Sequence, residues 1–188
     1  MTSEPATRAS DGRTFSLLLV PLAAGCAVSL TLGIYGRLHR PSGIAVNVAG
    51  FSSPQTVKVW LASAAVLFAL VQITSAGVMY GKIPGIKAPP WIGRLHRWSG
   101  RTAFLLTIPV VVQCLYALGF STFSTRTLAH SLLGCFFYGA FTAKMLVLPK
   151  RDLPDWVLRT MGGLVFSALV GVWLTSSFWF FTTFGVKL

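Results

Sequence analysis

The three histidines of this chain share one spacing, because each is followed by a glycine four residues further along. The pairs are His39 with Gly43, His96 with Gly100, and His130 with Gly134. Neutral imidazole is the usual nitrogen ligand for haem iron and many other metals in proteins. On a helix, a glycine at position i+4 leaves room on the same face one turn away. The spacing therefore indicates a site where a flat macrocycle lies against a helix.

The composition indicates what kind of structure must position these histidines. Hydrophobic residues make up 54% of the 188 residues, and charged residues only 11%. Five apolar segments are long enough to cross a hydrocarbon core, which takes about 20 helical residues. They are Phe15–Gly36, Val59–Gly81, Thr102–Phe120, Thr127–Leu148 and Thr160–Phe184. The sequence therefore predicts an all-α integral membrane bundle of five transmembrane helices, embedded in the lipid bilayer of the cell membrane.

The chain divides into a short tail and one domain. Residues 1–14 are polar and rich in Ser and Thr, which predicts a disordered cytoplasmic tail. Residues 15–188 hold all five apolar segments, and nothing in them suggests a second domain.

The formal net charge of +12 has the sign of a nucleic-acid-binding protein, but the basic residues sort by side of the membrane instead. Eleven of the sixteen fall on the side of the N-terminus: Arg8, Arg13, Lys82, Lys87, Arg94, Arg97, Arg101, Lys144, Lys150, Arg151 and Arg159. Excess Lys and Arg mark the cytoplasmic face. The pattern therefore predicts an inside N-terminus and an outside C-terminus, and no nucleic-acid partner. The basic loops could also attract anionic lipid or an acidic redox partner.

Depth in the membrane decides which histidines can share a metal. His39 follows the first segment and His130 begins the fourth, so both are expected at the outer boundary. A single haem iron could then bind both imidazoles, one from each side of the porphyrin. His96 is expected at the inner boundary, about 30 Å away across the hydrocarbon core. An inner haem would need another axial ligand, and the sulfur candidates at that depth are Met79, Met145 and Met161.

Arginines near the histidines fit the same interpretation. Arg97 follows His96 directly, and Arg126 precedes His130 by four residues. Haem propionates are anionic and pair well with guanidinium groups. The plainer interpretation is that arginines gather at the ends of membrane helices whatever their function.

A resemblance supports the haem interpretation. The run Leu95-His96-Arg97-Trp98-Ser99-Gly100-Arg101, followed by an apolar segment, resembles the His-Arg-x-x-Gly helix starts of transmembrane b-type cytochromes. His130-Ser131-Leu132-Leu133-Gly134 adds a second such element, and the whole chain is similar to an uncharacterised five-helix family of actinobacterial membrane proteins. The cytochrome resemblance implies a helical core that holds haem b and passes electrons. The di-haem cytochromes carry four histidines on four core helices, whereas the second and fifth segments here have none, which excludes two haems with paired histidines.

Polar residues within the apolar segments allow a different interpretation. Gln72 and Gln113 fall near mid-membrane, where they could hydrogen-bond each other or line a path for a quinone or solute. Small residues spaced four apart, such as Gly139 with Ala143, suit close helix contact. Two functions therefore remain open. One is haem-b-binding electron transfer, and the other is a cofactor-free accessory or assembly subunit of a larger membrane complex; enzymatic activity is left undecided.

Overall fold

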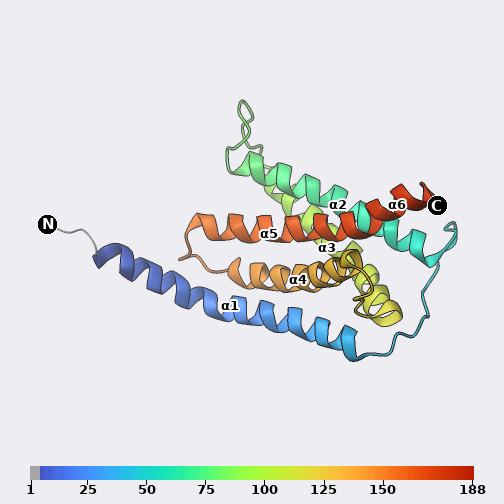
Figure 1. Ribbon diagram of the computed structural model, residues 1–188. Coiled ribbons are helices and arrows are strands. Elements are labelled where there is room, and N and C mark those ends of the chain that lie inside the picture. The colour runs from blue at the N-terminus through green and yellow to red at the C-terminus, as the bar shows by residue number, and fades with distance from the viewer. Residues whose placement is uncertain (1–4) are drawn as a thin grey trace.

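The computed structural model describes residues 5–188, which form five helical runs and no strand. Two of these runs contain a π-helical segment, in which the backbone hydrogen bonds reach one residue further than in an α-helix. The elements are α1 (Pro5–Leu38), α2 (Pro54–Met79), α3 (Ile92–Val112) continuing into η1 (Gln113–Leu118), α4 (Thr125–Val147), and α5 (Asp155–Trp173) continuing through η2 (Leu174–Phe178) into α6 (Trp179–Phe184). Figure 1 shows α1, α4 and α5 lying lengthwise beside one another.

Four of the five helical runs are long and apolar enough to cross a membrane. They are Thr14–Leu38, Pro54–Met79, Ile92–Leu118 and Asp155–Phe184. The fifth run, α4, carries Arg126, His130 and Lys144 within its length, which lowers its hydropathy. The prediction of an all-helical protein is confirmed for the described residues, with four helical runs long and apolar enough to cross a membrane.

All five helical runs begin earlier than the apolar pattern predicts, and α1 and α3 differ most from it. Helix α1 begins at Pro5, so residues 5–14 are helical here, whereas the sequence predicts a disordered tail. Residues 1–4 of that predicted tail lie outside the described residues. Helix α3 begins at Ile92 and not at Thr102, because its charged first turns continue the helix beyond the apolar segment. His96 therefore lies within a helix.

Matching capping motifs fix the starts of α2 and α4. Ser53 precedes α2, where its hydroxyl accepts from the Thr56 backbone N–H at 3.3 Å and its own N–H donates to Thr56 Oγ1 at 3.2 Å. Ser124 and Thr127 repeat this reciprocal pair at the start of α4. Each capping box satisfies backbone donors that a helix start leaves unpaired.

The bundle has two distinguishable ends. The basic end holds the α2–α3 and α4–α5 connections, and it lies to the left in Figure 1. The π-helical end holds η1, η2, the α1–α2 connection and the C-terminus. His96 lies toward the basic end, whereas His39 and His130 lie toward the π-helical end.

Small residues bring the helices close together. A Cβ added to Gly25 of α1 would lie 2.6 Å from the Gly139 carbonyl oxygen and 3.0 Å from the Ala143 Cβ of α4. The predicted use of Gly139 and Ala143 in a close helix contact is therefore confirmed. The core cluster consists mostly of α2, α4 and α5 residues, namely Ala69, Phe137, Ala168 and Leu169. Small side chains are typical of tightly packed membrane helices, because hydrophobic burial drives little association within lipid.

Aromatic side chains connect α3 to α4. The ring of Phe104 stacks on Phe141 with 4.0 Å between centroids. The Tyr138 hydroxyl donates to the Thr107 carbonyl oxygen at 2.9 Å.

Candidate functional site

His39 caps the end of η1. Its ring lies between Tyr35, at 5.0 Å between centroids, and Tyr116, at 5.2 Å. Its Nε2 contacts the Tyr116 carbonyl oxygen at 3.2 Å, and the Gly43 N–H donates to the Ala117 carbonyl at 3.1 Å. The last carbonyls of a helix need such donors, because no further turn supplies them. Gly43, with φ of 66°, serves this turn and does not lie on a helix face.

The segment that connects η1 to α4 passes between the end of α1 and the start of α4. The Phe120 N–H donates to the Gly36 carbonyl oxygen at 2.7 Å, and the Ser121 N–H donates to Ser131 Oγ at 3.1 Å. His39 therefore has its contacts on α1 and η1, while His130 lies on the other side of this segment. The two imidazoles have different partners: His39 contacts Tyr35 and Tyr116, whereas His130 contacts Thr175 of η2.

His96 belongs to a hydrogen-bonded cluster between α2 and α3. Its Nδ1 lies 2.9 Å from Ser75 Oγ, and that hydroxyl donates to the Gln72 carbonyl oxygen at 3.0 Å. The Gln72 side-chain amide donates both to the His96 carbonyl oxygen and to Ser99 Oγ. A Cβ added to Gly100 would lie 2.8 Å from Gln72 Oε1. The face that Gly100 leaves open is therefore filled by the Gln72 amide.

The two glutamines do not pair with each other, although the sequence allows that pairing. Gln72 bonds to α3, while the Gln113 amide donates to the Pro54 carbonyl oxygen at the start of α2, at 3.2 Å. Each amide thus connects α2 to the α3–η1 run at a different depth.

His130 lies in the second turn of α4 and is partly buried. Its Nδ1 lies 3.2 Å from the Thr175 hydroxyl of η2. That hydroxyl donates its proton to the Gly171 carbonyl oxygen at 2.8 Å, so it faces His130 as an acceptor. If the Thr175 hydroxyl gives its proton to that carbonyl, the neutral ring carries its own proton on Nδ1 and its lone pair on Nε2. A histidine that binds a metal through Nε2 has this tautomer when its Nδ1–H donates to a neighbouring acceptor.

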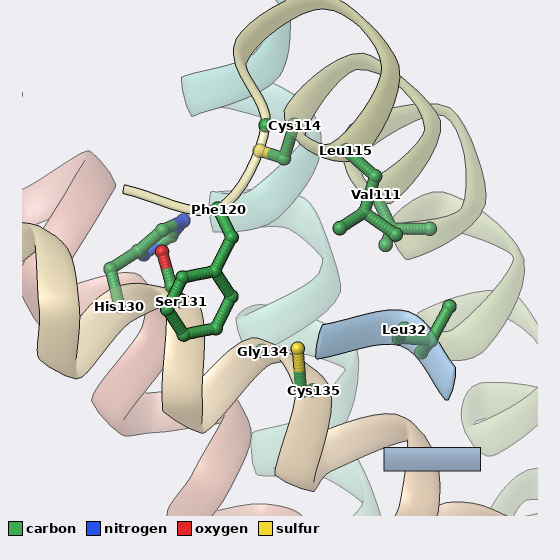
Figure 2. A pocket seen from close by; sticks show the side chains of 10 residues that line it. Leu32, Val111, Cys114, Leu115, Phe120, His130, Ser131, Gly134 and Cys135 are labelled. Carbon is green, nitrogen blue, oxygen red and sulfur yellow. The ribbon is translucent and has the colours of Figure 1, made fainter. Parts of the chain in front are cut away.

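His130 and Gly134 together border a cavity of about 60 Å³. A Cβ added to Gly134 would have no atom within 4 Å. Figure 2 shows the His130 ring beside Phe120 and Ser131. The other lining residues come from α1, the α3–η1 run, the following loop and α4: Leu32, Val111, Cys114, Leu115, Gly119 and Cys135. The His130–Gly134 pair thus opens on a cavity.

An apolar groove of about 320 Å³ adjoins this cavity. The two share Leu32, Val111 and Leu115. The groove lies between α1 and the α3–η1 run, and its remaining lining residues are Tyr35, Val112, Tyr116 and Tyr138. The cavity and the larger apolar groove are therefore neighbours with a shared apolar wall.

The two arginines that the sequence places beside histidines have different surroundings. Arg126 Nη1 donates to the Thr175 carbonyl oxygen at 2.6 Å, and its guanidinium lies 3.6 Å from the centroid of the Trp179 ring. Arg126 and His130 thus contact the same residue of η2. Arg97 is exposed at the basic end. No cluster of three or more His, Cys, Asp or Glu residues that could hold a metal ion forms within residues 5–188.

The sequence matches one family model over residues 18–188, described as a family of unknown function (DUF6529). The chain belongs to this family. No curated protein and no solved structure matches it. The description assigns no activity to DUF6529, so the site of this family member must be interpreted from its own geometry.

Two residues beside His130, Thr175 and Phe120, could not be predicted as part of the site from the sequence. Thr175 orients His130 from 45 positions away, and no local pattern connects them. Phe120 belongs to a loop whose backbone is hydrogen-bonded to Gly36, and its ring lies beside His130. The sequence contains one weak indication of how Thr175 is held. Thr175 lies one turn after Gly171, and a helical threonine can donate to the carbonyl of residue i−4.

Proposed function

We propose that this DUF6529 member is a haem-binding electron-transfer protein of the membrane, with His130 as the protein ligand of one haem b. The observation that supports this proposal is the surroundings of His130. Thr175 contacts Nδ1, Gly134 leaves open space one turn away, and the ring borders a cavity that shares an apolar wall with a groove. Haem, when bound, supplies one-electron redox chemistry.

The volumes of the cavity and of the groove limit how a macrocycle could fit beside His130. A cavity of about 60 Å³ has room for only a few water molecules, since one water needs roughly 10–15 Å³ by the same measure. The neighbouring groove, at about 320 Å³, reaches the lower end of the ~300–1,000 Å³ that small-molecule sites occupy. Phe120 stands beside His130, so its ring would have to turn aside when the macrocycle binds.

The lining suits a macrocycle in chemistry as well. Leu32, Val111 and Leu115 offer an apolar surface where cavity and groove meet. Arg126 uses Nη1 on a backbone carbonyl, and its remaining N–H groups could pair with a propionate. His39 and His96 are left out of this ligand set, because their surroundings assign them to a helix cap and to a helix–helix contact.

The proposal includes the membrane arrangement. All five helical runs cross the bilayer, with the N-terminus inside and the C-terminus outside. Helix α4 contacts both α1 and α5, so its polar residues are shielded by neighbouring helices, which supports its crossing as well. The basic end carries most of the cations, which is the distribution expected of a cytoplasmic face.

A second candidate is the cofactor-free accessory or assembly subunit. It is favoured by one observation: all three imidazoles already have hydrogen-bond partners within the protein. Such a bundle would need no metal to satisfy its buried histidines.

Visible absorption spectroscopy separates the two. The protein is produced in haem-replete cells, purified in mild detergent, and assayed for its Soret band and its haem content per chain. We expect about one haem per chain, lost in His130→Ala and retained in His96→Ala and His39→Ala. A wild-type protein without a Soret band, or a band unchanged in His130→Ala, contradicts the haem proposal. Stoichiometric co-purification of another membrane protein would then support the accessory subunit.

A further inference from the structure

The first turns of α3 extend beyond the membrane core at the basic end. The run Ile92–Leu118 has 27 residues. At 1.5 Å per residue it is about 40 Å long, whereas the hydrocarbon core is about 30 Å thick. Residues from Thr102 onward are apolar, so the excess length belongs to Ile92–Arg101, which carries the charges. This segment therefore lies at the level of the lipid headgroups.

Two kinds of exposed side chain lie next to each other on this segment. At about 100° per residue, three arginines fall on one side of the helix and two tryptophans with a leucine fall on the adjacent side. We name these residues the arginine–tryptophan arc: Trp91, Arg94, Leu95, Arg97, Trp98 and Arg101. Trp91 is 52% exposed and Trp98 is 64% exposed. The opposite side of the helix holds the buried Ser99 and Ala103, which face the rest of the bundle.

The arc has the charge of a surface that binds anions. The Arg101 guanidinium lies 5.2 Å from the centroid of the Trp98 ring, a cation–π contact that holds the cation beside the ring. Lys82 and Lys87, in the connection before α3, are exposed at the same end. The sequence contains no acidic residue between Asp11 and Asp152, so α2, α3 and their connection supply no carboxylate. The carboxylates at this end, Asp152 and Asp155, belong to the α4–α5 connection and the start of α5, and the cations at this end outnumber them.

We propose that the arginine–tryptophan arc binds anionic phospholipid, with headgroup phosphates accepting hydrogen bonds from Arg94, Arg97 and Arg101. The two exposed tryptophans favour lipid over an acidic soluble protein. An indole ring is stable at the boundary between headgroups and acyl chains, where its ring is in apolar surroundings and its N–H remains hydrated. An acidic protein would pair with the arginines but would leave this aromatic surface uncovered. The site is independent of His130 and of any haem.

The test measures how strongly phospholipids stabilise the detergent-solubilised protein. Phosphatidylglycerol and phosphatidylcholine of equal chain length are titrated at physiological salt, and the thermal unfolding midpoint and the lipids retained in native mass spectra are recorded. We expect tighter binding of phosphatidylglycerol. Each arginine near an anionic surface contributes roughly fivefold to binding, so the triple variant Arg94→Gln/Arg97→Gln/Arg101→Gln should lose roughly tenfold to a hundredfold of that preference.

Matched variants separate this site from general charge attraction. Arg37→Gln/Arg40→Gln removes exposed cations at the π-helical end and should keep the preference. Arg94→Lys/Arg97→Lys/Arg101→Lys keeps the charges and should keep most of it, which also shows that substitution in the arc leaves the fold intact. Inorganic phosphate and glycerol phosphate should not replace the lipid, because neither covers the tryptophans. Equal binding of both lipids, equal loss in the Arg37/Arg40 variant, or full replacement by free phosphate overturns the proposal. So does binding of an acidic protein at the arc without any lipid preference.

Discussion

Gly25 of α1 and Gly139 of α4 meet backbone to backbone. A Cβ on Gly25 would lie 2.6 Å from the Gly139 carbonyl oxygen, and a Cβ on Gly139 would overlap Ser29 Oγ and the Gly25 carbonyl oxygen. Ser29 Oγ donates to the Cys135 carbonyl oxygen at 3.1 Å, one turn along the same contact. This close approach fixes the register of α1 against the helix that carries His130.

Gly139→Ala should therefore destabilise the protein. Forcing a methyl group into a packed contact costs about 1–3 kcal/mol, and here the methyl group would meet both the Ser29 hydroxyl and the Gly25 backbone carbonyl. The measurement is the thermal unfolding midpoint in detergent. Gly163→Ala is the matched control, because a Cβ there has no atom within 4 Å. Equal midpoints for Gly139→Ala and wild type would show that α1 is not packed as described.

The sequence predicts the Gly139 contact but not its partner. Four-residue spacing of Gly139 and Ala143 indicates a close helix contact, whereas nothing in the sequence shows that α1 supplies the other side.

The same limit applies to the histidines. Helix periodicity predicts that Gly134 lies one turn from His130, which the structure confirms. It cannot show that Gln72, from another helix, fills the corresponding face at Gly100. The spacing of residues along one helix predicts which side chains share a face of that helix. It does not predict which side chains a neighbouring helix places against that face.

The contact between Gly100 and Gln72 gives a compensation test. Gly100→Ala should lower the unfolding midpoint, because its Cβ would lie 2.8 Å from Gln72 Oε1. Gln72→Ala should lower it as well, because the His96 carbonyl and Ser99 hydroxyl lose their amide partner, at a typical cost of about 1–3 kcal/mol. In the double variant the clash is absent, because the amide that causes it is absent. The double variant should therefore lose less stability than the two single variants lose together. Strictly additive losses would argue against this contact.

Thr175→Val tests how His130 is oriented. The valine keeps the shape of threonine but removes the acceptor for His130 Nδ1. Loss of such a partner typically weakens metal binding about 10- to 100-fold, so we expect weaker haem retention and a shifted Soret maximum with helix content unchanged. Thr182→Val is the control, because its hydroxyl bonds only within its own helix and is exposed. Haem retention equal to wild type in Thr175→Val would remove Thr175 from the site.

His39 should affect stability and not haem. His39→Ala removes the hydrogen bond to the Tyr116 carbonyl oxygen and the stacking between Tyr35 and Tyr116, so the end of η1 should fray. Losing one such hydrogen bond costs about 1 kcal/mol. We expect a lower unfolding midpoint and faster hydrogen exchange in η1, with haem content per chain unchanged. His39→Gln retains an N–H donor and should recover part of the midpoint. If His39→Ala instead abolishes the Soret band while η1 keeps its protection, His39 is an iron ligand and the capping role assigned to it is wrong.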